Sequence, residues 1–176
     1  MWSRVSYRLW QLGQMVVARP LSVACQQDIA AILSPPEQAL FYQFLPSDQN
    51  HSYRVMQLVR TRRDDNRALL AAALLHDIGK TRVRLHWWDR VFIVMGMVMG
   101  KRMYTQWGQG KPSGWRKGIV VRINHPAWGA DMAEAISSDA LTVALIRRHQ
   151  DVLPADAAAT LENELLRLLQ WADDQN

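Results

Sequence analysis

Cysteine and long apolar runs are what this sequence most lacks. Its 176 residues include one cysteine, Cys25, which excludes an internal disulfide and a cluster of thiolate ligands. Any metal site must therefore be built from histidine and acidic side chains. The longest apolar stretch, Val91 to Gly100, has 10 residues, whereas a membrane-spanning helix needs about 20. Residues 1–20 also lack the continuous apolar run of a secretory signal, so we expect a cytoplasmic protein.

Basic residues are concentrated in one segment of the chain. The formal net charge is +5, yet residues 82–122 hold nine Lys or Arg and one acidic residue, Asp89. Residues 123–176 hold three basic and nine acidic residues. The basic segment could attract an anionic substrate, a nucleic acid or an anionic membrane surface, or it could be a solvated face.

The apolar periodicity indicates an all-α fold. No segment alternates with a period of two over a useful length, and no internal repeat is present. Helical patterns occupy most of the chain, with breaks at the prolines and at charged connections. The predicted helices cover about residues 5–18, 23–33, 37–45, 47–60, 67–76, 124–136, 139–149 and 155–174.

The stretch Leu-Leu-His-Asp-Ile-Gly-Lys at 74–80 is the chemical centre of the sequence. The segment before it is apolar on every side, which is typical of a buried helix, so His76 and Asp77 emerge at the end of a core element. A neutral imidazole and an ionised carboxylate on adjacent residues can bind one divalent cation. We expect Gly79 to adopt the left-handed conformation that ends a helix, which would turn Lys80 toward the same opening.

Other side chains that can bind metal fall at predicted helix ends or on an inward stripe. His51 lies on the apolar stripe of one helix. Asn-His-Pro at 124–126 is expected to open another helix, with its asparagine as the cap and its proline in the first turn. His149 and Asp173 fall at the ends of the last two helices, and Asp174 is the alternative to Asp173.

This order of His, His-Asp, His, His and Asp resembles the HD-domain (HDIG-type) superfamily of metal-dependent phosphohydrolases. The stretch at 74–80 matches the family's central motif. His-Pro-Ala-Trp-Gly-Ala at 125–130 looks like its His-Pro-x-x-Gly-Ala element, and Trp-Ala-Asp at 171–173 is similar to its closing Ala-Asp. His86 lies outside this pattern.

The resemblance implies a fold and a domain organisation. The fold would be an HD-domain helical bundle that forms a single domain over residues 1–176. An N-terminal helical extension of residues 1–46 would precede the HD core at 47–176. The core would carry a basic, Trp-rich insertion at about 82–122, which a compact HD domain lacks.

The resemblance also implies the ligands of a metal centre. His51, His76, Asp77 and Asp173 would bind one divalent transition-metal ion. His125 and His149 match the positions that bind a second ion in some members, bridged by Asp77. Manganese, iron, cobalt and nickel all remain open as the metal. Asp77 and Lys80 are the residues expected to take part in catalysis, with Lys80 stabilising charge on the phosphate.

The substrate and partners are less defined than the reaction class. We expect hydrolysis of a small anionic phosphoester such as a nucleotide, with no specific nucleic acid as partner. Residues 84–104 are compatible with contact to an anionic membrane or with an extra core or dimer helix, and residues 108–118 with a lid. A di-iron oxygenase would carry the same ligands, and a non-catalytic regulatory or membrane-surface binding module is the other alternative.

Overall fold

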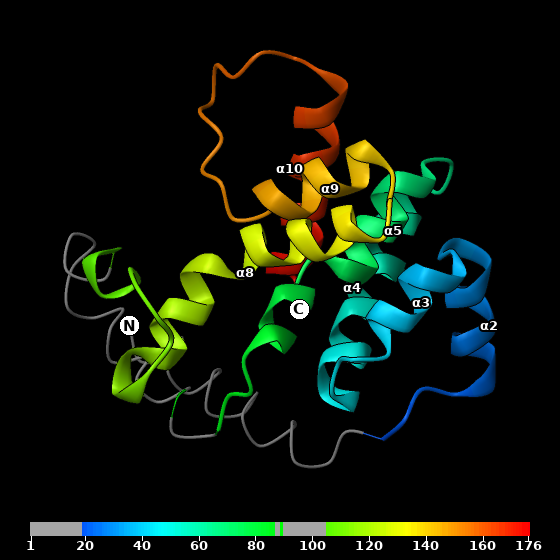
Figure 1. The fold of residues 1–176 in the computed structure, drawn as a ribbon. Helices are drawn as coiled ribbons and strands as arrows, with labels where there is room; N and C mark the ends of the chain where they lie inside the picture. Colours follow the sequence, from blue (N-terminus) through cyan, green and yellow to red (C-terminus); the bar gives the residue numbers. More distant parts are fainter. Residues whose placement is uncertain (1–18, 87–88, 90–104) are drawn as a thin grey trace.

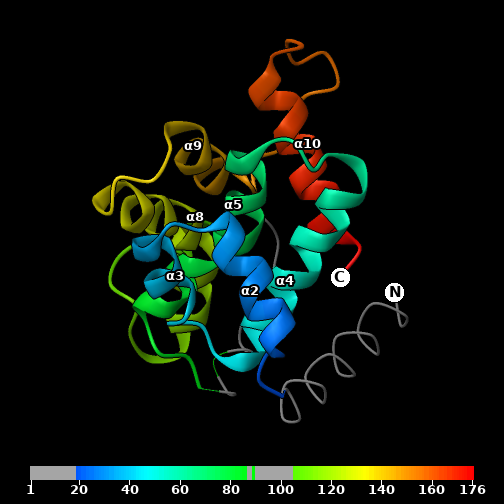
Figure 2. The same cartoon turned by 90° about the vertical axis from the view of Figure 1, so that its right-hand side faces the viewer.

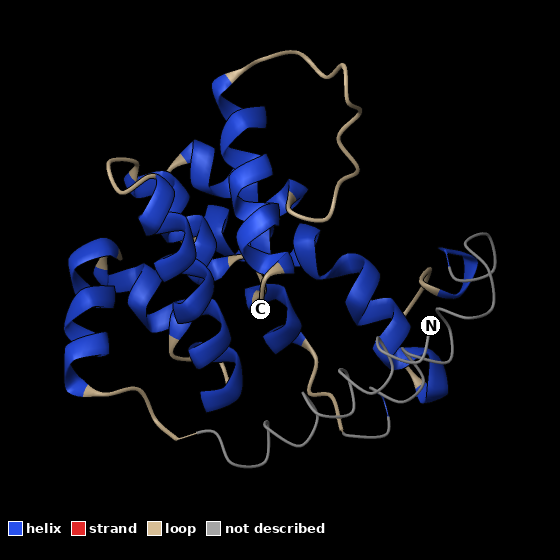
Figure 3. Cartoon of the chain, turned by 180° about the vertical axis from the view of Figure 1, so that it is seen from behind, coloured by secondary structure: helices blue, strands red, loops and turns tan. Residues whose placement is uncertain are grey.

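The computed structural model describes residues 19–86, 89 and 105–176. All regular secondary structure in these residues is helical, and none of them lies in a strand (Figures 1 and 3). The predicted all-α fold is therefore confirmed. The elements are α2 (Val23–Ile32), α3 (Pro35–Phe41), α4 (Pro46–Arg62), α5 (Arg67–Leu75), the 3-10 helices η2 (Ile78–Arg82) and η3 (Gly114–Arg116), α8 (Lys117–Ala135), α9 (Ala140–Arg148) and α10 (Leu161–Asp174).

Helix α5 lies at the centre of the bundle (Figures 1 and 2). All seven residues from Leu69 to Leu75 are buried, as their apolar sequence predicts. Helices α4 and α9 contact α5, and α2, α3 and α10 add further contacts. The side chain of Asn66 caps its first turn by accepting the Leu69 N–H at 2.9 Å. Because α5 is enclosed along its length, the residues that follow it also begin inside the protein.

Helices α2 and α3 belong to the same hydrophobic core as α5. Ile29 and Phe41 are fully buried in this core. The Asp28 carboxylate on α2 accepts hydrogen bonds from Tyr53 and Arg60 on α4, both at 2.9 Å. These contacts hold α2 against the helix that carries His51. The predicted helix at 5–18 lies outside the described residues.

Gly79 does not end a helix in the left-handed conformation, and that expectation is wrong. It lies within η2, and Gly110 and Gly114 are the described glycines with positive φ. A Cβ atom added to Gly79 would lie 2.0 Å from the His125 carbonyl oxygen. Glycine is required here because the backbone of η2 packs directly on the backbone of α8. This contact joins the element after Asp77 to the helix that carries His125.

Helix α8 begins at Lys117 and passes through Pro126, so the predicted start at residues 124–126 is wrong. Proline lacks the N–H that would bond to the carbonyl of Arg122 four residues earlier. That carbonyl instead accepts a hydrogen bond of 2.8 Å from Nδ1 of His125. The Asn124 side chain likewise bonds within the helix, to the Val120 carbonyl at 2.8 Å. Side chains thus bond to backbone carbonyls near the proline, and the helix continues.

The segment predicted to be a lid packs against α8. The Gly108 carbonyl accepts a hydrogen bond from the Asn124 side chain at 2.9 Å. The rings of Trp107 and Trp115 meet edge to face at 4.7 Å, and Gly118 is buried within α8. The segment 84–104 lies outside the described residues except for residues 84–86 and 89, so membrane contact there remains a prediction. Across the parts of the chain that can be described, no helix is long and apolar enough to cross a bilayer.

Candidate metal centre

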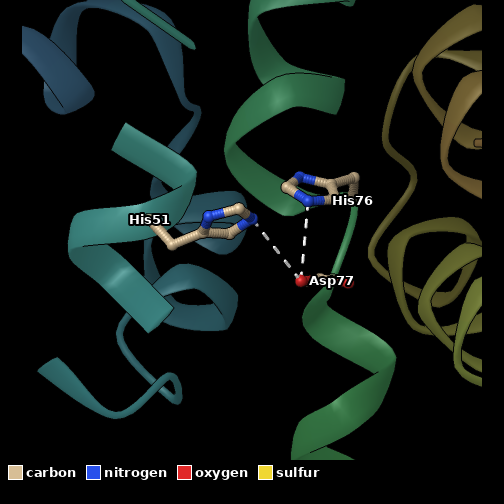
Figure 4. Close-up of side chains that lie close together, drawn as sticks. All are labelled: His51, His76 and Asp77. Carbon is tan, nitrogen blue, oxygen red and sulfur yellow. Dashed lines mark ion pairs between the residues drawn. The ribbon is translucent and has the colours of Figure 1, made fainter. Parts of the chain in front are cut away.

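Four side chains from three parts of the bundle converge where α5 ends. His76 is the C-cap of α5 and is followed by Asp77, while His51 reaches them from α4 (Figure 4). Oδ2 of Asp77 lies 3.5 Å from Nε2 of His76 and 3.9 Å from Nε2 of His51. Oδ1 of Asp173 in the last turn of α10 lies 3.1 Å from Nε2 of His51 and 3.6 Å from Nε2 of His76. We call His51, His76, Asp77 and Asp173 the first group.

The other oxygen of Asp77 faces a second set of side chains. Oδ1 lies 3.1 Å from Nε2 of His125 on α8 and 3.9 Å from Nε2 of His149 at the end of α9. The two Nε2 atoms are 3.2 Å apart. We call Asp77, His125 and His149 the second group. The carboxylate of Asp77 is thus shared between the two groups, one oxygen to each.

Three of the histidines are oriented by the same backbone contact. Nδ1 of His76 lies 2.9 Å from the Ala73 carbonyl, Nδ1 of His149 lies 2.7 Å from the Ile146 carbonyl, and His125 makes the matching bond to Arg122. In each case the acceptor belongs to the residue three positions earlier. A carbonyl can only accept, so Nδ1 carries the proton in each ring. The lone pair of each neutral imidazole is therefore on Nε2, which faces Asp77.

This arrangement suits a cation. Nε2 of His76 is buried, and no residue that the structure describes makes a hydrogen bond with it. In the second group, two Nε2 lone pairs and a carboxylate oxygen converge at 3.1 to 3.9 Å. Such a set of acceptors is mutually repulsive until a positive charge lies among them. Nitrogen and oxygen ligands of this kind suit divalent transition metals. The residues present therefore fit the metal ions that the sequence predicts.

The two groups differ in how they hold protons. Burial lowers the pKa of His76, but the carboxylates of Asp77 and Asp173 outweigh it and raise this pKa to about 9. Burial lowers the pKa of His125, and burial with the neighbouring charge of His76 lowers that of His149 to about 3. Burial would raise the pKa of Asp77, yet the cations of Lys80 and His76 hold it well below its usual range. At neutral pH the first group therefore carries a proton and the second does not.

Metal binding to the first group should depend on pH. A cation and a proton compete for Nε2 of His76, so binding at pH 7.5 should release about one proton per chain. Affinity at this group should rise about tenfold per pH unit from 7 and level off above about 9, where His76 has lost its proton. Binding to the second group should change little over this range. Titration calorimetry in buffers of different ionisation enthalpy measures the released protons, and a first-group affinity that stays constant from pH 7 to 9 would contradict the assignment.

Lys80 contacts the shared carboxylate directly. Its Nζ lies 2.5 Å from Oδ2 of Asp77, the oxygen that faces the first group. The side chain is 38% exposed, so the ammonium lies where the centre meets solvent. Lys80 is thus positioned to interact both with Asp77 and with an anion that approaches the centre from outside.

All six predicted metal ligands lie in the two groups, and the remaining candidates do not. The imidazole of His86 is exposed, and its backbone N–H bonds to Asp89. Asp174 is exposed, whereas Asp173 lies beside His51. The contact between the backbones at Gly79 and Gly129 was not predicted from the sequence. The signal for it was Gly129 itself, a glycine four residues after His125.

Comparison with known proteins supports part of the resemblance. Residues 49–96 match the family model described as the HD domain. Searches of curated proteins and of solved structures gave no match. The matched segment contains His51, His76 and Asp77, while His125, His149 and Asp173 lie beyond it. Over the helices that carry the first three predicted ligands, the chain is thus similar to the HD domain of metal-dependent hydrolases.

Proposed function

We propose that this protein is a metal-dependent phosphohydrolase that acts on a nucleotide or related phosphoester with two divalent ions. The observation that carries the proposal is the carboxylate of Asp77, whose two oxygens face two separate groups of ligand atoms. The similarity of residues 49–96 to the HD domain supports the hydrolase class. His51, His76, Asp77 and Asp173 would hold one ion, and Asp77, His125 and His149 would hold the other.

The charge of the centre favours an anionic substrate. The positive charge of two divalent cations would exceed the negative charge of the Asp77 and Asp173 carboxylates. The ammonium of Lys80 adds to this net positive charge. Arg82 on η2 and Arg122 on α8 belong to the same pair of packed elements. The guanidinium of Arg82 lies over the ring of Trp128, 5.6 Å from the ring centroid. A phosphate group would balance this excess, and a neutral substrate would not.

The residues of the chain would act by orienting the metal ligands and by placing a positive side chain beside the substrate phosphate. The backbone carbonyls of Ala73, Arg122 and Ile146 fix the Nδ1 tautomer of three histidines, which keeps their Nε2 lone pairs available. When bound, a pair of divalent ions supplies Lewis acidity toward a phosphoryl group and lowers the pKa of a water molecule. Lys80 would stabilise negative charge that develops on the phosphate, as a compact ammonium at the mouth of the centre.

A metal and substrate panel tests this proposal. The purified chain, loaded with manganese, iron, cobalt or nickel, should bind about two ions and release phosphate or a nucleotide product. The panel should include nucleoside monophosphates, dinucleoside polyphosphates and a chromogenic phosphodiester. Oxygen consumption by the iron form without phosphate release would support a di-iron oxygenase instead. Metal binding without turnover of any compound would support a binding module.

Removal of the second group should separate one-ion from two-ion chemistry. The double substitution His125→Ala and His149→Ala leaves the first group intact, so about one ion should remain per chain. The rate should fall about a thousandfold, because one source of charge stabilisation is lost. Elemental analysis and the rate on the best substrate check this result. A variant with the metal content and rate of the parent would show that the second group binds no functional ion.

A further inference from the structure

We infer that Gln170 on α10 is a positioning residue that holds His149 in the geometry needed to bind the second ion. This inference rests on the proposed two-ion function. No feature of the sequence pattern marks Gln170, and it lies outside the residues that match the HD domain. From α10, it contacts the backbone at the end of α9, where His149 lies.

The end of α9 is the place where Gln170 acts. Nε2 of Gln170 donates to the His149 carbonyl at 3.1 Å and to the Asp151 carbonyl at 2.8 Å. Both partners can only accept, so the amide nitrogen, rather than the amide oxygen, must face them. The last carbonyls of a helix have no donor within the helix and need one from elsewhere. Gln170 supplies this donor and anchors the chain where α9 ends.

The position of His149 depends on this anchor. The residue is the C-cap of α9, so it has a helical neighbour on one side only. Its ring is oriented by the bond from Nδ1 to the Ile146 carbonyl, and its main chain is held by Gln170. With both contacts present, Nε2 lies 3.2 Å from Nε2 of His125. Loss of the Gln170 amide would free the main chain and would spread the positions that Nε2 can occupy.

Gln170 also links the two groups through one helix. Residues three apart on a helix lie on the same face, so Gln170 and Asp173 share a face of α10. Asp173 contacts His51 of the first group, and Gln170 contacts the backbone of His149 in the second group. The same turn of α10 therefore sets the separation between ligands of the two groups. Outer contacts of this type commonly change metal affinity about ten- to a hundredfold.

The test compares Gln170→Leu with the parent by metal titration against a competing chelator. The leucine keeps the side-chain size and removes both donated bonds. The second ion should bind about ten- to a hundredfold more weakly, with the first unchanged within about twofold. Gln170→Lys, which restores a donor, should recover most of the affinity. Arg167→Leu is the matched control, because Arg167 on the same helix is exposed and donates to the Ala157 carbonyl of the neighbouring loop rather than to the end of α9.

A double-mutant cycle with His149→Ala separates positioning from general loosening of the fold. If Gln170 acts through His149, then Gln170→Leu should have no further effect on metal binding in the His149→Ala background. Equal weakening of both ions, or the same loss with and without His149, would overturn the inference. Unchanged binding in Gln170→Leu, with two ions in the parent, would also overturn it. A parent that binds only one ion would instead overturn the two-ion proposal and, with it, this inference.

Discussion

Replacement of Asp77 by alanine should abolish the binding of both proposed ions and lower the proposed phosphohydrolase activity by about four orders of magnitude. Asp77 is the residue that belongs to both groups, through Oδ2 in the first and Oδ1 in the second. Its removal leaves each set of histidines without the carboxylate next to them, and it also leaves Lys80 without its partner. No other single substitution in the centre should remove both ions together.

Two further variants sharpen this test. Asp77→Asn keeps the shape of the side chain and one oxygen acceptor but removes the charge, so it should retain at most weak binding of one ion. Asp174→Ala is the matched control, because Asp174 is an exposed carboxylate beside Asp173, and it should behave as the parent does. Elemental analysis, circular dichroism and rates on one substrate are the measurements. If Asp77→Ala bound one ion with the parent affinity, the groups would be independent rather than bridged.

Replacement of Gly79 by alanine should destabilise the protein by about 3 kcal/mol or more. The new Cβ would lie 2.0 Å from the His125 carbonyl oxygen, 2.6 Å from the Gly129 nitrogen and 2.8 Å from the His125 carbonyl carbon. All three atoms are backbone, so no side-chain rotation relieves the clash and η2 must move away from α8. This movement would also separate Asp77 from His125, so the second ion should bind more weakly.

Other glycines give a graded comparison for this prediction. Gly129→Ala places its Cβ 3.1 to 3.3 Å from its nearest neighbours, so its cost should be smaller. Gly110→Ala has open space around it but a φ of +92°, so it should cost only about 1 kcal/mol of backbone strain and leave metal binding unchanged. Denaturant unfolding of metal-free protein measures these differences. If Gly79→Ala cost no more than Gly110→Ala, the close backbone contact would not be the reason for glycine at position 79.

The sequence predicted the helical class and the residues that meet at the centre better than it predicted the local backbone. The burial of α5 follows from its apolar sequence, and the meeting of His76 and Asp77 with His51 follows from the resemblance to the HD domain. The start of α8 did not follow, because Pro126 normally indicates a first turn. The tertiary structure tolerates it inside the helix, since the side chain of His125 bonds to the carbonyl that the proline leaves free.

The role of Gly79 also depends on a contact between distant segments. A glycine after a helix favours a left-handed end in isolation. Here it packs on a helix that begins almost 40 residues later in the chain, and no local pattern encodes that contact. The bonds of Gln170 to the end of α9 are of the same kind, because they need both helices in place.

The direction of the helices has a consequence for ion binding that is independent of the ligand side chains. His76 and His149 are the C-caps of α5 and α9, and Asp173 lies in the last turn of α10. Three helices therefore point their carboxyl ends at one small volume. Each such end carries roughly half a negative charge from its aligned peptide dipoles. The backbone alone thus creates a negative electrostatic potential there, which adds to the attraction of the centre for cations.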